Sequence, residues 1–282
     1  MTADLSSLLP LLATEPALQA VAGRREAILA VPDPGRALAI AGLVTAVERR
    51  PVVVATATQN EADRLHADLV ALLGEDAAVE FPAWETLPFE RVSPAVETMG
   101  RRLQVLHRLQ DPATAPAVVV TPARALLQRL DPDAVTDPVD VGTGDMVDPV
   151  ELVETLVGLG YRREPQVEHR GEVAVRGSIV DVFPSTADSP VRIDLWGDEV
   201  ERLTEFSVAD QRATVAVAEV EIHPCRELRP TPASQDRARE LLVEEPWGRE
   251  QWDRIVDGQL FDGMESWLPW LVGEEALLPD LV

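Results

Sequence analysis

The hydrophobic pattern of this 282-residue chain changes its period once, and that change limits the folds that the chain can adopt. In the first half, short and wholly apolar runs alternate with segments of helical periodicity. After a stretch rich in proline, glycine and aspartate at residues 131–145, apolar residues recur at every second position. Apolar strands between helices are typical of a parallel sheet, and alternation is typical of an antiparallel one. The pattern therefore predicts an α/β chain with a parallel domain and a small antiparallel domain.

The expected elements follow from these patterns. Strands are predicted at residues 51–56, 77–81, 117–121, 172–177, 178–183, 191–196, 200–206 and 216–224. Helices are predicted at 5–22, with interruptions at Pro10 and Pro16, and at 36–49, 58–73, 93–109, 122–130, 148–159, 234–242, 247–258 and 264–271. Thr58 and Glu61 form a capping-box pattern in which Thr58 accepts from the third amide and Glu61 reaches back. The last strand of the antiparallel part is expected to return to the first domain.

The charge balance restricts the partners of the chain. All 25 basic residues are arginine, and 49 acidic residues bring the net charge to −24. This charge excludes a protein whose whole surface binds DNA or an anionic membrane, although a local basic patch remains possible. The absence of lysine excludes the usual phosphate-loop lysine and Schiff-base chemistry. The single cysteine, Cys225, excludes an internal disulfide and a cysteine zinc site, so no metal is predicted.

No targeting or membrane segment is predicted. The first 23 residues carry Asp4 and no arginine, whereas a secretory signal begins with a positive charge. The longest clean apolar run, residues 37–47, is too short to cross a bilayer. We therefore expect a cytoplasmic protein.

The loop at residues 30–37 tests for nucleotide binding, because helicase-like motor domains carry a GxxxxGK[ST] phosphate loop one helix ahead of such a strand. Only Gly35 matches. Ala30 replaces the first glycine, Arg36 replaces the lysine, and Ala37 lacks the hydroxyl that holds magnesium. The loop is either an ordinary helix entry or the remnant of an inactive motor domain. Both interpretations predict no ATP hydrolysis here, and no GxSxG, HExxH or CxxC motif suggests another catalytic site.

One group of basic residues stands out against the acidic background. It comprises Arg162, Arg163, Arg170 and Arg176. Arg170 and Arg176 are six apart, so they share a face if the strand is continuous across Gly171. Phe183 lies seven residues after Arg176 and beyond a predicted turn, so the spacing does not determine to which face of the sheet its side chain points. The group is either a docking site, since arginine is favoured at protein interfaces, or a solvated face neutralised by nearby glutamates.

Two apolar features point to packing or to interfaces. The segment 81–94 is too apolar for an idle loop, and we expect it to pack across domains. Four tryptophans fall in the last 36 residues: Trp247, Trp252, Trp267 and Trp270. They predict either a packed core or an exposed seam that a further part of the chain would cover.

Two sequence stretches resemble a known family. FPAWETLPFERVSPAVETMGRRLQVLHRL at residues 81–109 resembles the signature of the bacterial transcription-repair coupling factors. RGEVAVRGSIVDVFP and VRIDLWGDEVERLTEFSVADQR resemble the same family, and its relative UvrB, in a small clip domain. The resemblance covers about residues 31–226. It implies a degenerate RecA/helicase-like domain 1a at 1–138, a UvrA-binding domain 2 at 139–226, and the helical start of a truncated domain 1b at 227–282.

The resemblance also implies a function. Family members recruit UvrA to RNA polymerase stalled at a DNA lesion, as part of nucleotide excision repair. Carried over to this chain, Arg163, Arg170 and Arg176 become UvrA-binding residues, with Phe183 as an apolar anchor. Ala174 departs from the pattern, because UvrB has an arginine there. The chain itself is expected to be non-catalytic and without a cofactor. ATP, magnesium, polymerase and DNA would be bound by translocase domains and other parts of a longer protein.

Two other functions stay open at this point. A UvrB-like nucleotide-binding NTPase or helicase module would act on damaged DNA, and its activity would depend on Arg36. Direct DNA binding would weaken steeply with salt. A further hypothesis from the family is that another domain masks the UvrA-binding face in the longer protein.

Overall fold

The computed structural model describes residues 5–47, 51–88, 90–273 and 276–282, and the chain forms two compact units. The first unit comprises residues 1–83, 105–128 and 277–282, and the second comprises 84–104 and 129–276. Helix α5 (Val96–Gln110) contributes residues to both. The domain boundaries at 138 and 226 stay predictions.

The first unit is built on a three-stranded parallel sheet in the order β1-β3-β2. Its strands are β1 (Val52–Thr56), β2 (Ala78–Glu80) and β3 (Val118–Pro122). Val118, Val119 and Val120 of the central strand have no exposed surface. The sheet shares its core with α3 (Arg36–Ala46) and α4 (Gln59–Leu73). The predicted parallel α/β arrangement is confirmed.

The start of α4 differs from the expected capping box in one contact. The Thr58 hydroxyl accepts from the amide of Glu61 at 3.3 Å, as predicted. The Glu61 carboxylate accepts from the amide of Ala57 at 3.1 Å, one residue before the expected amide. Both contacts still satisfy backbone donors at the helix start. Gly74, with φ of +91°, ends the helix where the sequence predicts it.

Other helices of the first half are shorter than expected. Residues 5–22 form η1 (Ser6–Leu8), α1 (Leu9–Ala13) and α2 (Pro16–Val21), so the helical stretch is interrupted near Pro10 and at Pro16, as predicted. Helix α3 ends at Ala46, and the expected end at Arg49 lies outside the described residues. The predicted helix at 122–130 is wrong. Pro122 belongs to β3, only the turn η3 (Ala125–Leu127) follows, and the amide of Leu130 donates to the carbonyl of Ala276 at 2.8 Å.

The second unit contains a six-stranded sheet in the order β10-β9-β8-β7-β6-β5. Its strands are β5 (Arg162–Arg163), β6 (Glu172–Arg176), β7 (Ile179–Val182), β8 (Val191–Trp196), β9 (Glu199–Phe206) and β10 (Ala213–Val217). All neighbours are antiparallel except β5 and β6. Gly177 and Gly197, both with φ of +65°, lie in the two tight hairpins. The predicted antiparallel module, and with it the mixed α/β fold class, is confirmed.

The predicted strand at 216–224 is two strands in two sheets. β10 pairs with β9, whereas β11 (Glu219–Ile222) pairs with β4 (Val139–Gly142). Strand β4 lies in the stretch 131–145 that the sequence marks only as a boundary. Its partner is about 80 residues away in sequence, so local pattern carries no sign of the pairing.

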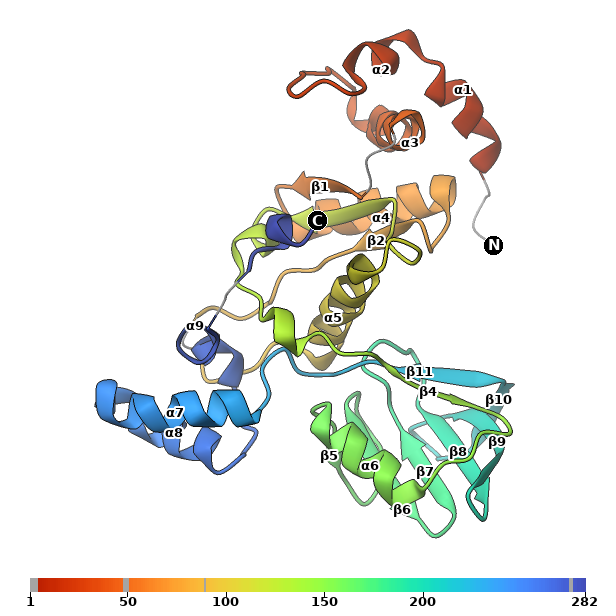
Figure 1. The fold of residues 1–282 in the computed structure, drawn as a ribbon. Helices are drawn as coiled ribbons and strands as arrows, with labels where there is room; N and C mark the ends of the chain where they lie inside the picture. Colours follow the sequence, from red (N-terminus) through yellow and green to blue (C-terminus); the bar gives the residue numbers. More distant parts are fainter. Residues whose placement is uncertain (1–4, 48–50, 89, 274–275) are drawn as a thin grey trace. The chain divides into compact units, whose positions relative to one another are not determined.

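One face of the six-stranded sheet is the core of this module. Figure 1 shows helix α6 (Pro149–Gly158) against this sheet. The helix packs there through Leu152, Val153 and Leu156. The Asp148 carboxylate caps the helix, accepting from the amides of Val150 and Glu151. The sheet contributes Val173, Val180, Val182, Val191, Ile193, Leu195 and Leu203 to the same core. Cys225 is buried in this core.

The remainder of the second unit is helical. It contains α7 (Pro232–Glu244), η5 (Pro246–Gly248), α8 (Arg249–Val256), η6 (Met264–Trp267) and α9 (Leu268–Leu271). Thr231 and Ser234 form a capping box at the start of α7. Trp252, fully buried, is part of the core between these helices. Figure 1 shows α7 and α8 side by side.

The apolar segment 81–94 is fixed through buried polar contacts. Phe89 lies outside the described residues. The Trp84 indole donates to the Glu227 carboxylate at 2.7 Å, and the same carboxylate pairs with Arg102 at 2.7 Å. The Ser93 hydroxyl donates to Glu265 at 2.6 Å. The segment thus ties the start of α5 to residues that follow the antiparallel module.

Candidate functional site

The face of the six-stranded sheet opposite α6 carries the charged residues. Side chains alternate along a strand, so residues between the core valines point to this second face. It bears Arg176, Asp181, Arg192, Asp194 and Arg202, and it is called the arginine face below. The register brings them together, because Asp181 lies opposite Arg192 and Asp194 lies opposite Arg202.

A buried carboxylate organises the arginine face. The Asp181 side chain has no exposed surface and accepts from Arg192 at 2.7 and 2.9 Å. Arg176 pairs with the same carboxylate. The hydrogen bonds to Asp181 raise the pKa of Arg192, and the Arg192 guanidinium also lies 4.8 Å from the Phe206 ring centre. Burying an unpaired carboxylate costs free energy of desolvation, and the ion pairs with the two arginines offset this cost.

The two arginines on Asp181 differ in what they can offer a partner. The Arg192 side chain is 17% exposed and is engaged by Asp181 and by the carbonyl of Gln211. The Arg176 side chain is 42% exposed and makes one contact, to Asp181. A guanidinium has five N–H donors, so Arg176 keeps donors for a ligand. Arg202, paired with Asp194 at 2.9 Å and 64% exposed, is similar.

Arg170 reaches this surface by a different route from the one that the sequence suggests. Gly171 has φ of +80°, so β6 begins at Glu172 and the strand is not continuous back to Arg170. The Arg170 side chain is held by the carbonyl of Ala187 at 2.8 Å and by Asp188 at 3.1 Å. Its guanidinium lies 5.2 Å from the Phe183 ring centre, a cation–π distance.

Phe183 lies under Arg170. Its backbone pairs with Glu172, which continues the ladder and places the ring on the arginine face. The residue is only 7% exposed and packs with Val167, Ala174 and Phe206. Phe183 therefore presents little apolar surface of its own, and its ring supports the Arg170 guanidinium.

Arg163 lies at the edge of the sheet. It is exposed in β5, and the parallel register places it opposite Val173, whose side chain belongs to the α6 core. Arg162 lies opposite Glu172, on the side of the arginine face. The structure thus brings Arg170, Arg176 and Phe183 to one face, whereas the register of β5 places Arg163 on the opposite side, the side of the α6 core.

The loop at residues 30–37 leads into helix α3 with the backbone geometry of an ordinary connection. Asp33–Gly35 is a single 3₁₀ turn ahead of α3, and Gly35 has φ of −93°. A Cβ on Gly35 would lie 3.2 Å from the Val31 side chain. Arg36 pairs with Asp33 at 2.9 Å, and both side chains are exposed. Ala30 and Ala37 offer no polar side chain. Ala30 and Arg36 line a hollow of about 430 Å³ whose other wall residues are apolar: Leu29, Val31, Ala39, Ile40 and Leu43.

Sequence reasoning missed the centre of the arginine face. Asp181 is the one charged residue of SIVDVF, and Arg192 shares VRIDLW with Asp194. A lone carboxylate in so apolar a strand signals a charged partner on a neighbouring strand, because an unpaired buried charge is costly. Counting arginines alone selected Arg176 and left out Arg192.

Among the described residues, no group of acidic, histidine or cysteine side chains has the arrangement of a metal site, and no helix is long and apolar enough to cross a membrane.

The fold and site define a small α+β module, with one face closed by a helix and the other bearing arginines around a buried aspartate. Residues 139–228 match the family model described as the UvrB interaction domain. This segment includes every strand of the six-stranded sheet and both strands β4 and β11. The chain therefore carries a UvrB interaction domain.

The whole chain is similar to a particular family of larger proteins. The transcription-repair-coupling factor of Mycobacterium bovis is 38% identical over 93% of this chain. Those of Myxococcus xanthus and Escherichia coli are 35% and 29% identical over 78% and 84% of it. The resemblance to transcription-repair coupling factors is thus confirmed. The chain spans about a fifth of the length of these curated relatives, at 22%, 20% and 21%.

Proposed function

We propose that this chain is the part of a transcription-repair coupling protein that recruits UvrA, and that it does so through the arginine face. The observation that carries the proposal is the coincidence of a UvrB interaction domain with an exposed group of arginines on one face of its sheet. Arginine pairs carboxylates in a fixed planar geometry and is enriched at interfaces. On a chain of net charge −24, this face is the clearest place for an acidic partner surface.

The contact residues in the proposal are Arg163, Arg170 and Arg176. Arg176 has spare donors beside Asp181, and Arg170 is stacked on Phe183 and held by Asp188. Such anchoring lowers the entropy that the side chain loses on binding. Phe183 enters the proposal as the support of Arg170. Arg163 stays in the proposal from the family resemblance: it is exposed on the edge strand β5, on the side of Val173, and would contact UvrA only if UvrA reaches around that edge.

A pull-down with UvrA tests the proposal. Arg176→Glu places a carboxylate beside Asp181 and should reduce UvrA capture by at least about thirtyfold, as for loss of a buried interfacial charge contact. Arg239→Glu is a control, since Arg239 is exposed on α7 and paired with Asp236. Capture that is equal for wild type and Arg176→Glu would remove Arg176 from the site.

The chain is further proposed to be non-catalytic, with polymerase, DNA, ATP and magnesium handled by other parts of the longer protein. The side chains of Ala30, Arg36 and Ala37 support this, because Arg36 is paired with Asp33 and neither alanine offers a ligand for magnesium. An ATPase assay on the purified chain tests it. Turnover that disappears on Arg36→Ala would restore the alternative of a UvrB-like NTPase module.

A further inference from the structure

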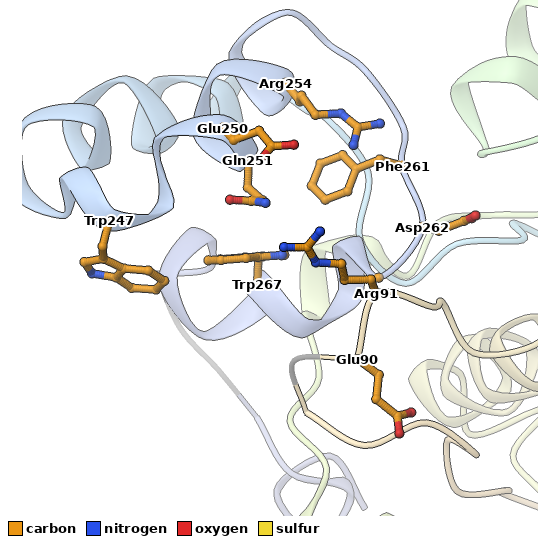
Figure 2. Close-up of a pocket in the computed structure, with 10 residues that line it drawn as sticks. Glu90, Arg91, Trp247, Glu250, Gln251, Arg254, Phe261, Asp262 and Trp267 are labelled. Atoms are coloured by element: carbon orange, nitrogen blue, oxygen red, sulfur yellow. The ribbon is translucent and has the colours of Figure 1, made fainter.

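A second surface with the composition of a binding site lies away from the UvrB interaction domain. It is a hollow of about 540 Å³ in the C-terminal helical part, which Figure 2 shows in close-up. Its wall consists of Glu90, Arg91, Trp247, Glu250, Gln251, Arg254, Phe261, Asp262, Gly263 and Trp267. The hollow therefore joins the loop at 90–91, helix α8 and the turn before η6. Its volume lies within the range of ligand pockets.

Two arginines face this hollow without a carboxylate partner. Arg254 lies with its guanidinium 4.3 Å from the Phe261 ring centre, which fixes its position. Arg91 comes from the opposite wall, and Figure 2 shows its guanidinium beside Trp267. Across the described part of the chain, neither guanidinium has an acidic group within ion-pair distance. Two guanidinium groups without a carboxylate partner around one hollow form an anion-binding arrangement.

The acidic residues of the wall do not cancel this charge. The Glu90 carboxylate accepts from the amide of Leu87 at 2.8 Å. Figure 2 shows Glu90 and Asp262 turned away from the aromatic rings, and only Glu250 on the inner side with Gln251. Two cations and one anion therefore surround the centre. This balance suits one carboxylate and disfavours a polyanion such as a nucleotide or a nucleic acid strand.

The floor of the hollow is a rigid aromatic surface. Trp247 and Trp267 are stacked, with ring centres 5.5 Å apart. Trp267 in turn packs edge-on against the buried Trp252 at 4.9 Å, whose indole donates to the carbonyl of Glu245. Trp247 is nevertheless 56% exposed. Exposed tryptophan beside arginine is the usual composition of the centre of a protein interface.

We propose that this hollow binds a protein segment that presents an Asp or Glu side chain next to an apolar one. The carboxylate bridges Arg91 and Arg254, and the apolar neighbour packs on Trp247 and Trp267. Charge complementarity selects the carboxylate, and the exposed indoles select the apolar group. Gly263 allows the 90–91 loop to lie close to the turn before η6. A Cβ at this position would lie 2.6 Å from the carbonyl oxygen of Glu90 and would displace the loop.

The test uses the ¹⁵N-labelled chain and two probes, acetyl-Phe-Glu-amide and acetyl-Phe-Gln-amide. The indole N–H signals of Trp247 and Trp267 should move on addition of the glutamate probe, with a dissociation constant of about 1 mM. The signals of Trp84 and Trp196, outside the hollow, should stay. The glutamine probe should bind about tenfold more weakly, because it cannot make charge-assisted bonds.

Matched variants separate the hollow from general effects of charge. Arg91→Gln with Arg254→Gln should remove the preference for the glutamate probe. Arg239→Gln with Arg249→Gln, which changes net charge equally at exposed positions outside the hollow, should keep it. Unchanged Trp84 and Trp196 signals in each variant establish that it is folded. The proposal is overturned if both probes bind equally, if Trp247 and Trp267 do not respond, or if adenosine monophosphate moves the same signals at lower concentration.

Discussion

The two arginines that share Asp181 should differ in what they contribute to stability, and this difference tests how the arginine face is built. Arg192→Ala removes two hydrogen bonds to a carboxylate that has no exposed surface, together with the stacking on Phe206. Breaking a buried ion pair costs about 3–5 kcal/mol. Because Arg176 remains on Asp181, we expect a loss of about 2–3 kcal/mol. Arg176→Ala removes one contact of a side chain that is 42% exposed, where solvent replaces much of it, and should cost about 0.5–1 kcal/mol.

Hydrogen exchange measured by mass spectrometry is the suitable assay. A chain with two compact units need not unfold in one step, so the free energy of opening is best read from peptides of strands β6–β9. Arg202→Ala, on the same face but with a 64% exposed side chain, is the control and should cost less than about 1 kcal/mol. If Arg176→Ala lowered the free energy of opening as much as Arg192→Ala, the assignment of Arg192 to stability and of Arg176 to partner binding would be wrong.

Three other predictions concern buried groups. Burial raises the pKa of the Cys225 thiol to about 12, so at pH 8 the folded chain should react with iodoacetamide far more slowly than the chain in urea, as mass spectrometry would show. Tyr161→Phe removes a hydroxyl that donates to the carbonyl of His223 and accepts from the amide of Ser185, and it should cost about 1–3 kcal/mol in chemical unfolding. Arg102→Ala leaves the buried Glu227 without its cation and should cost about 3–5 kcal/mol, whereas loss below about 1 kcal/mol would mean that water reaches this site.

The sequence predicts elements well where the signal is local. The valine runs at β1 and β3 and the Thr58 cap of α4 act within a few residues, and each forms as expected. The failures depend on distant partners. The helix expected at 122–130 is lost because Leu130 pairs with Ala276, and the strand expected at 216–224 divides because Glu219–Ile222 pairs with β4.

The site shows the same limit. Arginine spacing drew attention to Arg170 and Arg176, but the even count between them assumed a continuous strand that Gly171 interrupts. Arg170 comes to the face through Ala187 and Asp188, which are distant in sequence. The pairing of Asp181 with Arg192 depends on strand register, which the alternation of side chains constrains only once neighbouring strands are known.

The central claim is that the arginine face binds UvrA, and calorimetric titration of UvrA with this chain tests it most directly. The variant Arg163→Glu, Arg170→Glu, Arg176→Glu should lose binding, with affinity lower by a factor of about a thousand or more if the three contacts act together. The control Arg64→Glu, Arg239→Glu, Arg249→Glu changes the net charge equally at exposed positions and should bind as wild type does. Equal affinity of both triple variants and wild type for UvrA would contradict the account.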